Sequence, residues 1–220
     1  MPTGRRAERA GGWAFSVLAL AAAGVLFWAP WHKAGSYLVG SPDAGSGDPA
    51  VTAPANPAAA AIVPARLEIP AIGVDTTVES RGTTHYRNPF TGQTVEGYGV
   101  PESMLTTSWW SDGPRPGSGR MAVILGHEQP GGPGVFNRLD QLRPGDAVVL
   151  RNSDGTALNL RVLGSPVTGL DKATSALADL LNHHPAGADV ALITCGGQFD
   201  DAARASEDNE VVFAGLGAAR

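Results

Sequence analysis

Short apolar runs separated by turn residues dominate the chain from about residue 62 onward. Each run is four to seven residues long and is bounded by Gly, Pro, Asp, Asn or Ser, which is typical of short β-strands. The segment Asn152-Ser153-Asp154-Gly155, between two runs, has the residue types that a tight hairpin turn requires. The pattern therefore predicts a β-barrel or a β-sandwich. The seven runs are 66–69, 74–78, 121–125, 147–151, 157–163, 190–194 and 211–214.

One segment has helical spacing instead. In 172–181 the apolar residues recur at the interval of a single helical face, which predicts one short helix packed on the β framework. The 29 glycines and 17 prolines, with only 6% aromatic residues, favour many turns and short strands over long helices. The apolar residues of the predicted helix are Ala173, Ala176, Leu177, Leu180 and Leu181.

A longer apolar stretch, 10–32, contains no Asp, Glu, Lys or Arg. As a helix it would be about 34 Å long, enough to cross a hydrocarbon core of about 30 Å. We expect a transmembrane signal anchor. A cleaved signal peptide is the alternative, because Ala19 and 21–23 offer small residues to a peptidase.

Basic residues are unevenly placed around this stretch. Arg5, Arg6 and Arg9 precede it, whereas only Lys33 follows closely. The excess of positive charge on the cytoplasmic side of membrane proteins predicts that 1–9 lies in the cytoplasm and that everything after the span lies outside the cell, at the plasma membrane.

Residues 33–61 follow the span and are mostly Pro, Ala, Gly, Ser and Asp. Such a composition cannot bury enough apolar surface to fold, so this segment is predicted to be a flexible tether. The remaining residues, 62–220, are enough for one extracellular domain with its own core. The net charge of −5 and the lack of a basic cluster argue against a nucleic-acid partner.

Cys195 is the only cysteine of the chain, so no internal disulfide can form. It ends an apolar run and is followed by Gly196-Gly197, a position where a side chain stands at the rim of a β framework. The residue is either an inert buried thiol, an intermolecular bridge or a nucleophile.

Cysteine catalysis needs a proton acceptor and a group that stabilises the developing oxyanion. His127 follows the run 121–125 as Cys195 follows 190–194, and Arg204 lies nine residues after the cysteine. Taken alone, His127 is better explained as a loop histidine, and Arg204 as a solvated surface charge. His183 and His184 match no common zinc spacing, so we interpret them as residues at a helix C-terminus.

Three motifs follow one another in 62–220. They are Arg66-Leu67-Glu68-Ile69-Pro70-Ala71-Ile72-Gly73-Val74-Asp75, then Leu125-Gly126-His127 with the later Gly132-Pro133-Gly134-Val135-Phe136-Asn137-Arg138-Leu139, and last Leu192-Ile193-Thr194-Cys195-Gly196-Gly197-Gln198-Phe199-Asp200. With these motifs in this order, 62–220 resembles the sortases, membrane-anchored cysteine transpeptidases of Gram-positive bacteria. The resemblance is to the class E/F type, and class F is the most similar.

The resemblance implies a mostly β fold, a closed sortase-type β-barrel of about eight strands with one or two short helices. It implies Cys195 as nucleophile, His127 as acid/base and Arg204 as the residue that stabilises the substrate carbonyl and oxyanion. The substrates would be secreted proteins with an LPXTG-like sorting signal, cleaved between Thr and Gly. A peptidoglycan precursor or pilin amine would accept the protein, and no cofactor or metal is required.

One departure from the family pattern keeps an alternative open. Sortases usually carry a tyrosine where this chain has Ser206, in Ala205-Ser206-Glu207-Asp208-Asn209. A catalytically impaired sortase-like surface binding module is therefore the second hypothesis. A cysteine transpeptidase that acts on peptidoglycan stems is disfavoured, because such enzymes carry the cysteine in a Ser-x-Gly-Cys setting.

Overall fold

The computed structural model describes residues 60–216. The predicted cytoplasmic segment 1–9, the span 10–32 and almost all of the tether 33–61 lie outside the described residues. Among residues 60–216, no helix is both long enough and apolar enough to cross a membrane.

The described part of the chain is mostly β. It contains a single α-helix, α1 (Ala176–Asn182), and two 3-10 turns, η1 (Pro70–Ile72) and η2 (Leu139–Gln141). The strands are β1 (Arg66–Ile69), β2 (Val74–Arg81), β3 (Thr83–Arg87), β4 (Thr94–Tyr98), β5 (Thr107–Trp110), β6 (Ala122–Gly126), β7 (Ala147–Arg151), β8 (Ala157–Val162), β9 (Val167–Asp171), β10 (Val190–Asp200) and β11 (Ala205–Leu216).

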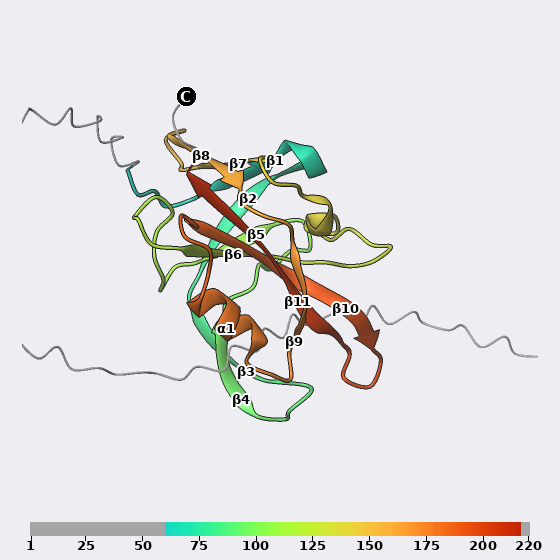
Figure 1. The fold of residues 1–220 in the computed structure, drawn as a ribbon. Helices are drawn as coiled ribbons and strands as arrows, with labels where there is room; N and C mark the ends of the chain where they lie inside the picture. Colours follow the sequence, from blue (N-terminus) through green and yellow to red (C-terminus); the bar gives the residue numbers. More distant parts are fainter. Residues whose placement is uncertain (1–59, 217–220) are drawn as a thin grey trace, which may run out of the picture.

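Eight strands close into a barrel (Figure 1). Their order is β10-β6-β5-β2-β1-β7-β8-β11, and the pairing of β10 with β11 joins the two ends of the sheet. Closure removes the free strand edges that an open sheet would expose. The predicted barrel of about eight strands is confirmed, and the helix is short as expected.

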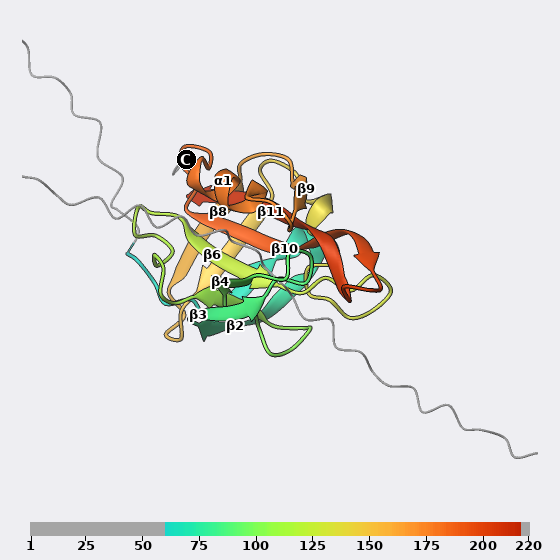
Figure 2. The ribbon, with the colours of Figure 1, turned by 90° about the horizontal axis from the view of Figure 1, so that it is seen from below.

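Three strands lie outside this ring. Strand β9 pairs with the first half of β11, and β3 and β4 form a separate hairpin. Figure 2 shows α1 and β9 on the side of the barrel formed by β8 and β11. This arrangement covers the outer face of β10 and β11, where the predicted nucleophile is located.

Side-chain alternation divides the buried residues into two groups. In β8, Leu158, Leu160 and Val162 are buried while the residues between them are exposed, as expected for a strand with one face in the barrel. Leu192 of β10 belongs to the barrel interior, whereas its neighbour Ile193 packs on the outer face with residues of α1. A strand that is buried on both faces has a nearly continuous apolar sequence, as the first part of β10 does.

Two features of the predicted elements differ from the structure. The long strands β10 and β11 extend beyond the predicted runs 190–194 and 211–214 into a hairpin that includes polar residues, so 196–209 is largely paired strand. The helix begins at Ala176, not at residue 172, because Lys172 still follows the β9 pairing with β11. Sequence periodicity also missed β3, β4, β5 and β9.

Gly126, which ends β6 just before His127, provides a test of this packing. A Cβ at this position would overlap the ring of Phe136, which is 1% exposed and cannot move aside. Overpacking of this kind costs roughly 1–3 kcal/mol. We expect Gly126→Ala to lower the free energy of unfolding by that amount in chemical denaturation.

The matched control is Gly164→Ala, because a Cβ on Gly164 would meet no atom within 4 Å. This variant should change the free energy of unfolding by a few tenths of a kcal/mol at most. Equal stabilities for the two variants would contradict the tight packing of Phe136 against β6.

Candidate active site

Parallel pairing of β6 with β10 brings the predicted nucleophile and acid/base to the same end of the barrel. Ile193 is the register partner of Leu125, so Cys195 and His127 each lie two residues beyond the same pair. The Thr194 hydroxyl donates a hydrogen bond of 2.9 Å to the Gly126 carbonyl. This bond also connects strands β10 and β6. The two residues therefore occupy neighbouring positions just beyond the paired segment of β6 and β10.

His127 is only 6% exposed and its ring is oriented by a backbone contact. Its Nε2 lies 3.0 Å from the Pro101 carbonyl oxygen. Because a carbonyl only accepts, Nε2 carries the hydrogen and donates it. In the neutral imidazole Nδ1 is then the nitrogen that can take up a proton. The backbone carbonyl of His127 also accepts from Phe136 N, at 2.9 Å.

Cys195 is 6% exposed and lies on the outer face of β10, among apolar residues of the same face. Burial raises the pKa of the Cys195 thiol, the positive charge and hydrogen bond of Lys172 lower it, and the negative charge of Glu128 raises it. Burial alone is what an inert cysteine would show. The charged neighbour is what distinguishes this thiol from an inert one.

Lys172 is the residue that sequence reasoning missed. It follows β9, is 1% exposed, and its Nζ lies 3.1 Å from Cys195 Sγ. The same ammonium donates to the Ser206 carbonyl at 2.7 Å. A signal was available in the composition: the chain has two lysines, Lys33 and Lys172, and uses arginine at its other 14 basic positions.

Two further polar groups near the thiol have no hydrogen-bond partner among the described residues. Asn209 is the register partner of Cys195 on β11, is fully buried, and both polar atoms of its carboxamide are unpaired. The Tyr86 hydroxyl on β3 is also buried and unpaired, and burial and then the Cys195 charge raise the pKa of Tyr86. The Asn209 amide can donate to an oxygen of a substrate bound beside Sγ.

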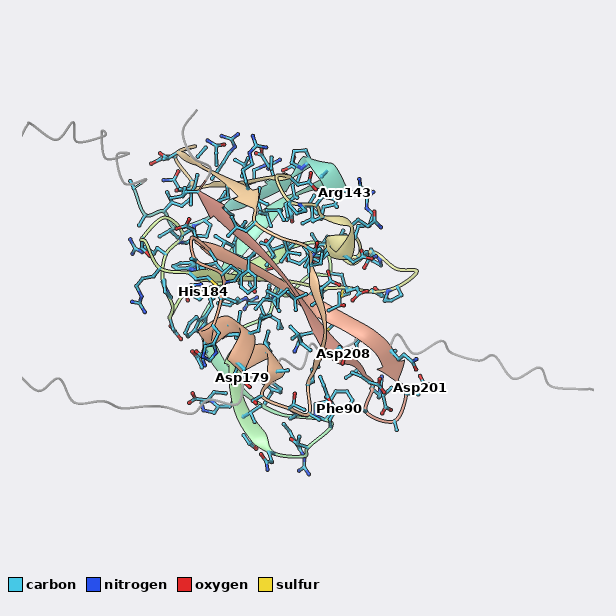
Figure 3. All side chains as sticks on the ribbon, in the orientation of Figure 1. Phe90, Arg143, Asp179, His184, Asp201 and Asp208 are labelled. Atoms are coloured by element: carbon cyan, nitrogen blue, oxygen red, sulfur yellow. The ribbon has the colours of Figure 1, made fainter. Side chains whose placement is uncertain are left out.

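Arg204, the third predicted site residue, is not brought to the thiol. It is exposed and sits in the turn of the β10–β11 hairpin with a positive φ of 53°. Figure 3 shows the neighbouring Asp201 at the tip of this hairpin, farther along it than Asp208. The five residues from Cys195 to Asp200 correspond to about 16 Å of extended strand, which is beyond the reach of an arginine side chain.

Carboxyl groups gather on the other face of β11. Glu210 pairs with Thr194 and, by alternation, shares the barrel face of Val212. Burial, and then the charges of Asp140 and Glu128, raise the pKa of Glu210 to about 7. The pKa of Glu128 is also raised, by burial and by Asp140, although Lys172 lowers it.

Three other residues, His183, Trp109 and Trp110, have structural roles. His183 caps the C-terminus of α1, and its Nδ1 lies 2.9 Å from the Asp179 carbonyl. Trp109 is buried in the barrel core, and Trp110 packs edge-on against Tyr98. Within residues 60–216 there is no cluster of His, Cys, Asp and Glu that could hold a metal ion.

The sortase domain family matches residues 67–216, which is most of the chain. The chain therefore belongs to the sortase family. No curated protein matches its sequence significantly.

Solved sortase structures are similar in fold at low sequence identity. A sortase transpeptidase of Clostridium perfringens is 18% identical, with a TM-score of 0.48, over 70% of this chain and 79% of that one. The lid mutant of sortase A of Corynebacterium diphtheriae is 17% identical, with a TM-score of 0.49, over 74% of each chain. Sortase C-1 of Actinomyces oris is 21% identical, with a TM-score of 0.47, over 70% of this chain and 73% of that one.

The raised pKa of Glu210 predicts a pH-dependent stability. In the unfolded chain this carboxyl loses its proton near pH 4.5, whereas the folded protein holds it until about pH 7. Stability from this group is thus complete below pH 4.5 and is lost as the pH rises to about 7. Glu210→Gln, which stays neutral, should exceed the wild type by roughly 2–3 kcal/mol at pH 8.

Urea denaturation at pH 4 and pH 8 measures this difference, which should vanish at the lower pH. Glu96→Gln on the surface strand β4 removes the same charge from an exposed position and is the matched control. A gain of equal size at both pH values would contradict a buried carboxyl that resists ionisation.

Proposed function

We propose that this sortase is a cysteine transpeptidase of the class E/F type, with class F the most similar. It cleaves an LPXTG-like sorting signal between Thr and Gly, forms a thioacyl-enzyme, and transfers the protein to a cell-wall amine. The observation that carries the proposal is the placement of Cys195 and His127 side by side, each two residues beyond the last parallel pair of β10 and β6, in a chain of the sortase family.

The proposed reaction uses these two residues in two proton transfers. His127 Nδ1 accepts the thiol proton, and Cys195 Sγ attacks the carbonyl carbon of the Thr-Gly bond. The carbonyl π pair becomes the oxyanion, to which the unpaired amide of Asn209 can donate. On collapse the C–N bond breaks, the departing amine takes the proton from Nδ1, and a thioester remains on Sγ. An acceptor amine then attacks the thioester carbonyl and gives its proton to Nδ1, the C–S bond breaks as the C–N bond forms, and the sulfur leaves with the electron pair.

The location of the enzyme is part of the same proposal. The uncharged stretch 10–32 would anchor the protein in the plasma membrane, and 33–61 would tether the domain on the extracellular side. On this side of the membrane the catalytic domain would bind proteins that carry a sorting signal, and a peptidoglycan precursor or a pilin amine would accept the cleaved protein.

A catalytically impaired binding module is the second candidate, and one observation favours it. Arg204, which the family resemblance made the oxyanion residue, lies in an exposed turn at the end of the hairpin. In such a module a sorting peptide would bind to the domain without forming a thioester.

Intact mass spectrometry of the full chain in detergent separates the two candidates. The protein is mixed with a peptide library of the form Leu-Pro-x-Thr-Gly, with and without hydroxylamine. We expect an acyl adduct that hydroxylamine discharges and that Cys195→Ala cannot form. His127→Ala should slow its formation by roughly 10²–10⁴-fold, because general acid–base catalysis contributes about that much.

Peptide binding without any adduct would contradict the transpeptidase and support the binding module. Arg204→Ala is the control that tests the residue named from the sequence. Because Arg204 lies outside reach of the thiol, this variant should form the adduct at close to the wild-type rate.

A further inference from the structure

The only lysine of the described domain is buried against the only cysteine of the chain. Lysine is almost never fully buried unless its charge is paired, because removing an ammonium from water costs several kcal/mol. Lys172 is 1% exposed, and its Nζ has two partners, Cys195 Sγ at 3.1 Å and the Ser206 carbonyl at 2.7 Å. Its position therefore requires an explanation.

Of these two partners, only the sulfur can become an anion. Within residues 60–216 no carboxylate forms an ion pair with Lys172: the salt bridges of the domain involve arginines and His85 instead. The backbone carbonyl of Ser206 offers a dipole, not a charge. The buried ammonium of Lys172 therefore has an anion in direct contact when Cys195 is a thiolate.

The lysine is held in place by the backbone on both sides. Its N–H donates to the Glu207 carbonyl of β11 at 3.0 Å, and its carbonyl accepts from Asn88 Nδ2 at 2.9 Å. Asn88 is itself buried, and its Oδ1 accepts the backbone N–H groups of Phe90 and Thr91 in the β3–β4 connection. A side chain supported in this way needs little reorganisation to meet a charge on Sγ.

We propose that Lys172 is a catalytic residue of this enzyme, whose ammonium group stabilises the Cys195 thiolate by direct contact. The proposal rests on the transpeptidase function proposed above and supplies the cation that Arg204, at the hairpin tip, does not bring to the site. Lys172 keeps its proton throughout the reaction: the thiol proton passes to His127, and the electron pair of the sulfur forms the S–C bond.

Groups from two other segments also lie near the thiol, so the effect of Lys172 has to be isolated from theirs. His127 and Glu128 follow β6, and Tyr86 belongs to β3. The negative charge of Glu128 opposes the thiolate, and burial does so more strongly. Lys172 is the one group that contacts Sγ with a positive charge among the described residues.

The test measures the thiolate without any peptide substrate. The full-length protein in detergent is alkylated with iodoacetamide from pH 5 to pH 10, and the rate of modification of Cys195 is followed by mass. Limited access to the buried thiol lowers all rates equally, so the pH midpoint reports the thiolate alone. We expect Lys172→Met to raise this midpoint by at least about one pH unit, since a contacting charge shifts a pKa by roughly 1–3 units.

Two variants control for charge and for folding. Lys172→Arg retains the positive charge and should keep the midpoint nearer to the wild type than Lys172→Met does. Arg204→Met removes one positive charge from the hairpin tip and should leave the midpoint unchanged. Far-ultraviolet circular dichroism and thermal melting establish that each protein is folded, and Lys172→Gln replaces the Met variant if that one is not.

Turnover of a sorting peptide gives a second readout. At pH values below the alkylation midpoint of the variant, kcat/KM of Lys172→Met should be about tenfold lower than that of the wild type for each pH unit by which the midpoint is raised. At high pH the variant should recover most of this loss. A merely structural role would lower kcat/KM at every pH and would not move the midpoint.

An unchanged midpoint in a folded Lys172→Met or Lys172→Gln variant overturns the proposal, as does an equal shift caused by Arg204→Met. Failure of the wild type to process any sorting peptide would overturn the proposed transpeptidase function instead. The alkylation midpoints remain interpretable in that case, so the two failures are distinguishable.

Discussion

The double pairing of β10 is the constraint on which the rest of this structure depends. One edge pairs in parallel with β6 and the other in an antiparallel register with β11, and together they close the barrel. The same two registers determine the neighbours of Cys195: His127 at the end of β6 and Asn209 directly opposite on β11. A one-residue slip on either edge would turn these side chains to the opposite face. The same two strand pairings therefore close the barrel and bring the residues of the site together.

Alternation along β10 and β11 then separates two electrostatic environments that are only one residue apart in sequence. Cys195 and Asn209 face outward toward Lys172, whereas Thr194 and Glu210 face the barrel. The thiol and the ammonium lie outside, and the Glu210 carboxyl lies inside. Because the pleat repeats every two residues, the sheet keeps Glu210 on the face opposite the thiol. The charge of Glu128, which follows β6, acts on both Cys195 and Glu210.

The sequence was sufficient for the features that depend on local pattern. Apolar runs bounded by turn residues predicted the barrel strands, and the equivalent positions of His127 and Cys195 after two such runs predicted that they belong together. Strands β3, β4, β5 and β9 were missed because their residues are largely polar or only partly apolar, so no period of two identifies them. Their existence depends on partners distant in the chain.

Lys172 was missed for the same physical reason. In the sequence it begins an apolar pattern with helical spacing, so it was assigned to the helix, and a cation was sought only after Cys195. Its contact with the thiol exists because β9 pairs with β11 and the side chain then extends past β11 toward β10, from a position 23 residues before the cysteine. No local spacing encodes a contact that depends on two strand registers at once.

The balance of charges at Sγ shows why this contact matters more than its single hydrogen bond suggests. Burial and Glu128 both raise the pKa of the thiol, and the charge and hydrogen bond of Lys172 are the influences that lower it. Two charges about 4 Å apart interact by about 4 kcal/mol at an effective dielectric constant of about 20, and the energy falls with distance. The pKa of Cys195 stays raised on balance, and the cation in contact offsets part of the effect of burial. Without Lys172, each remaining influence would favour the protonated, unreactive form of Cys195.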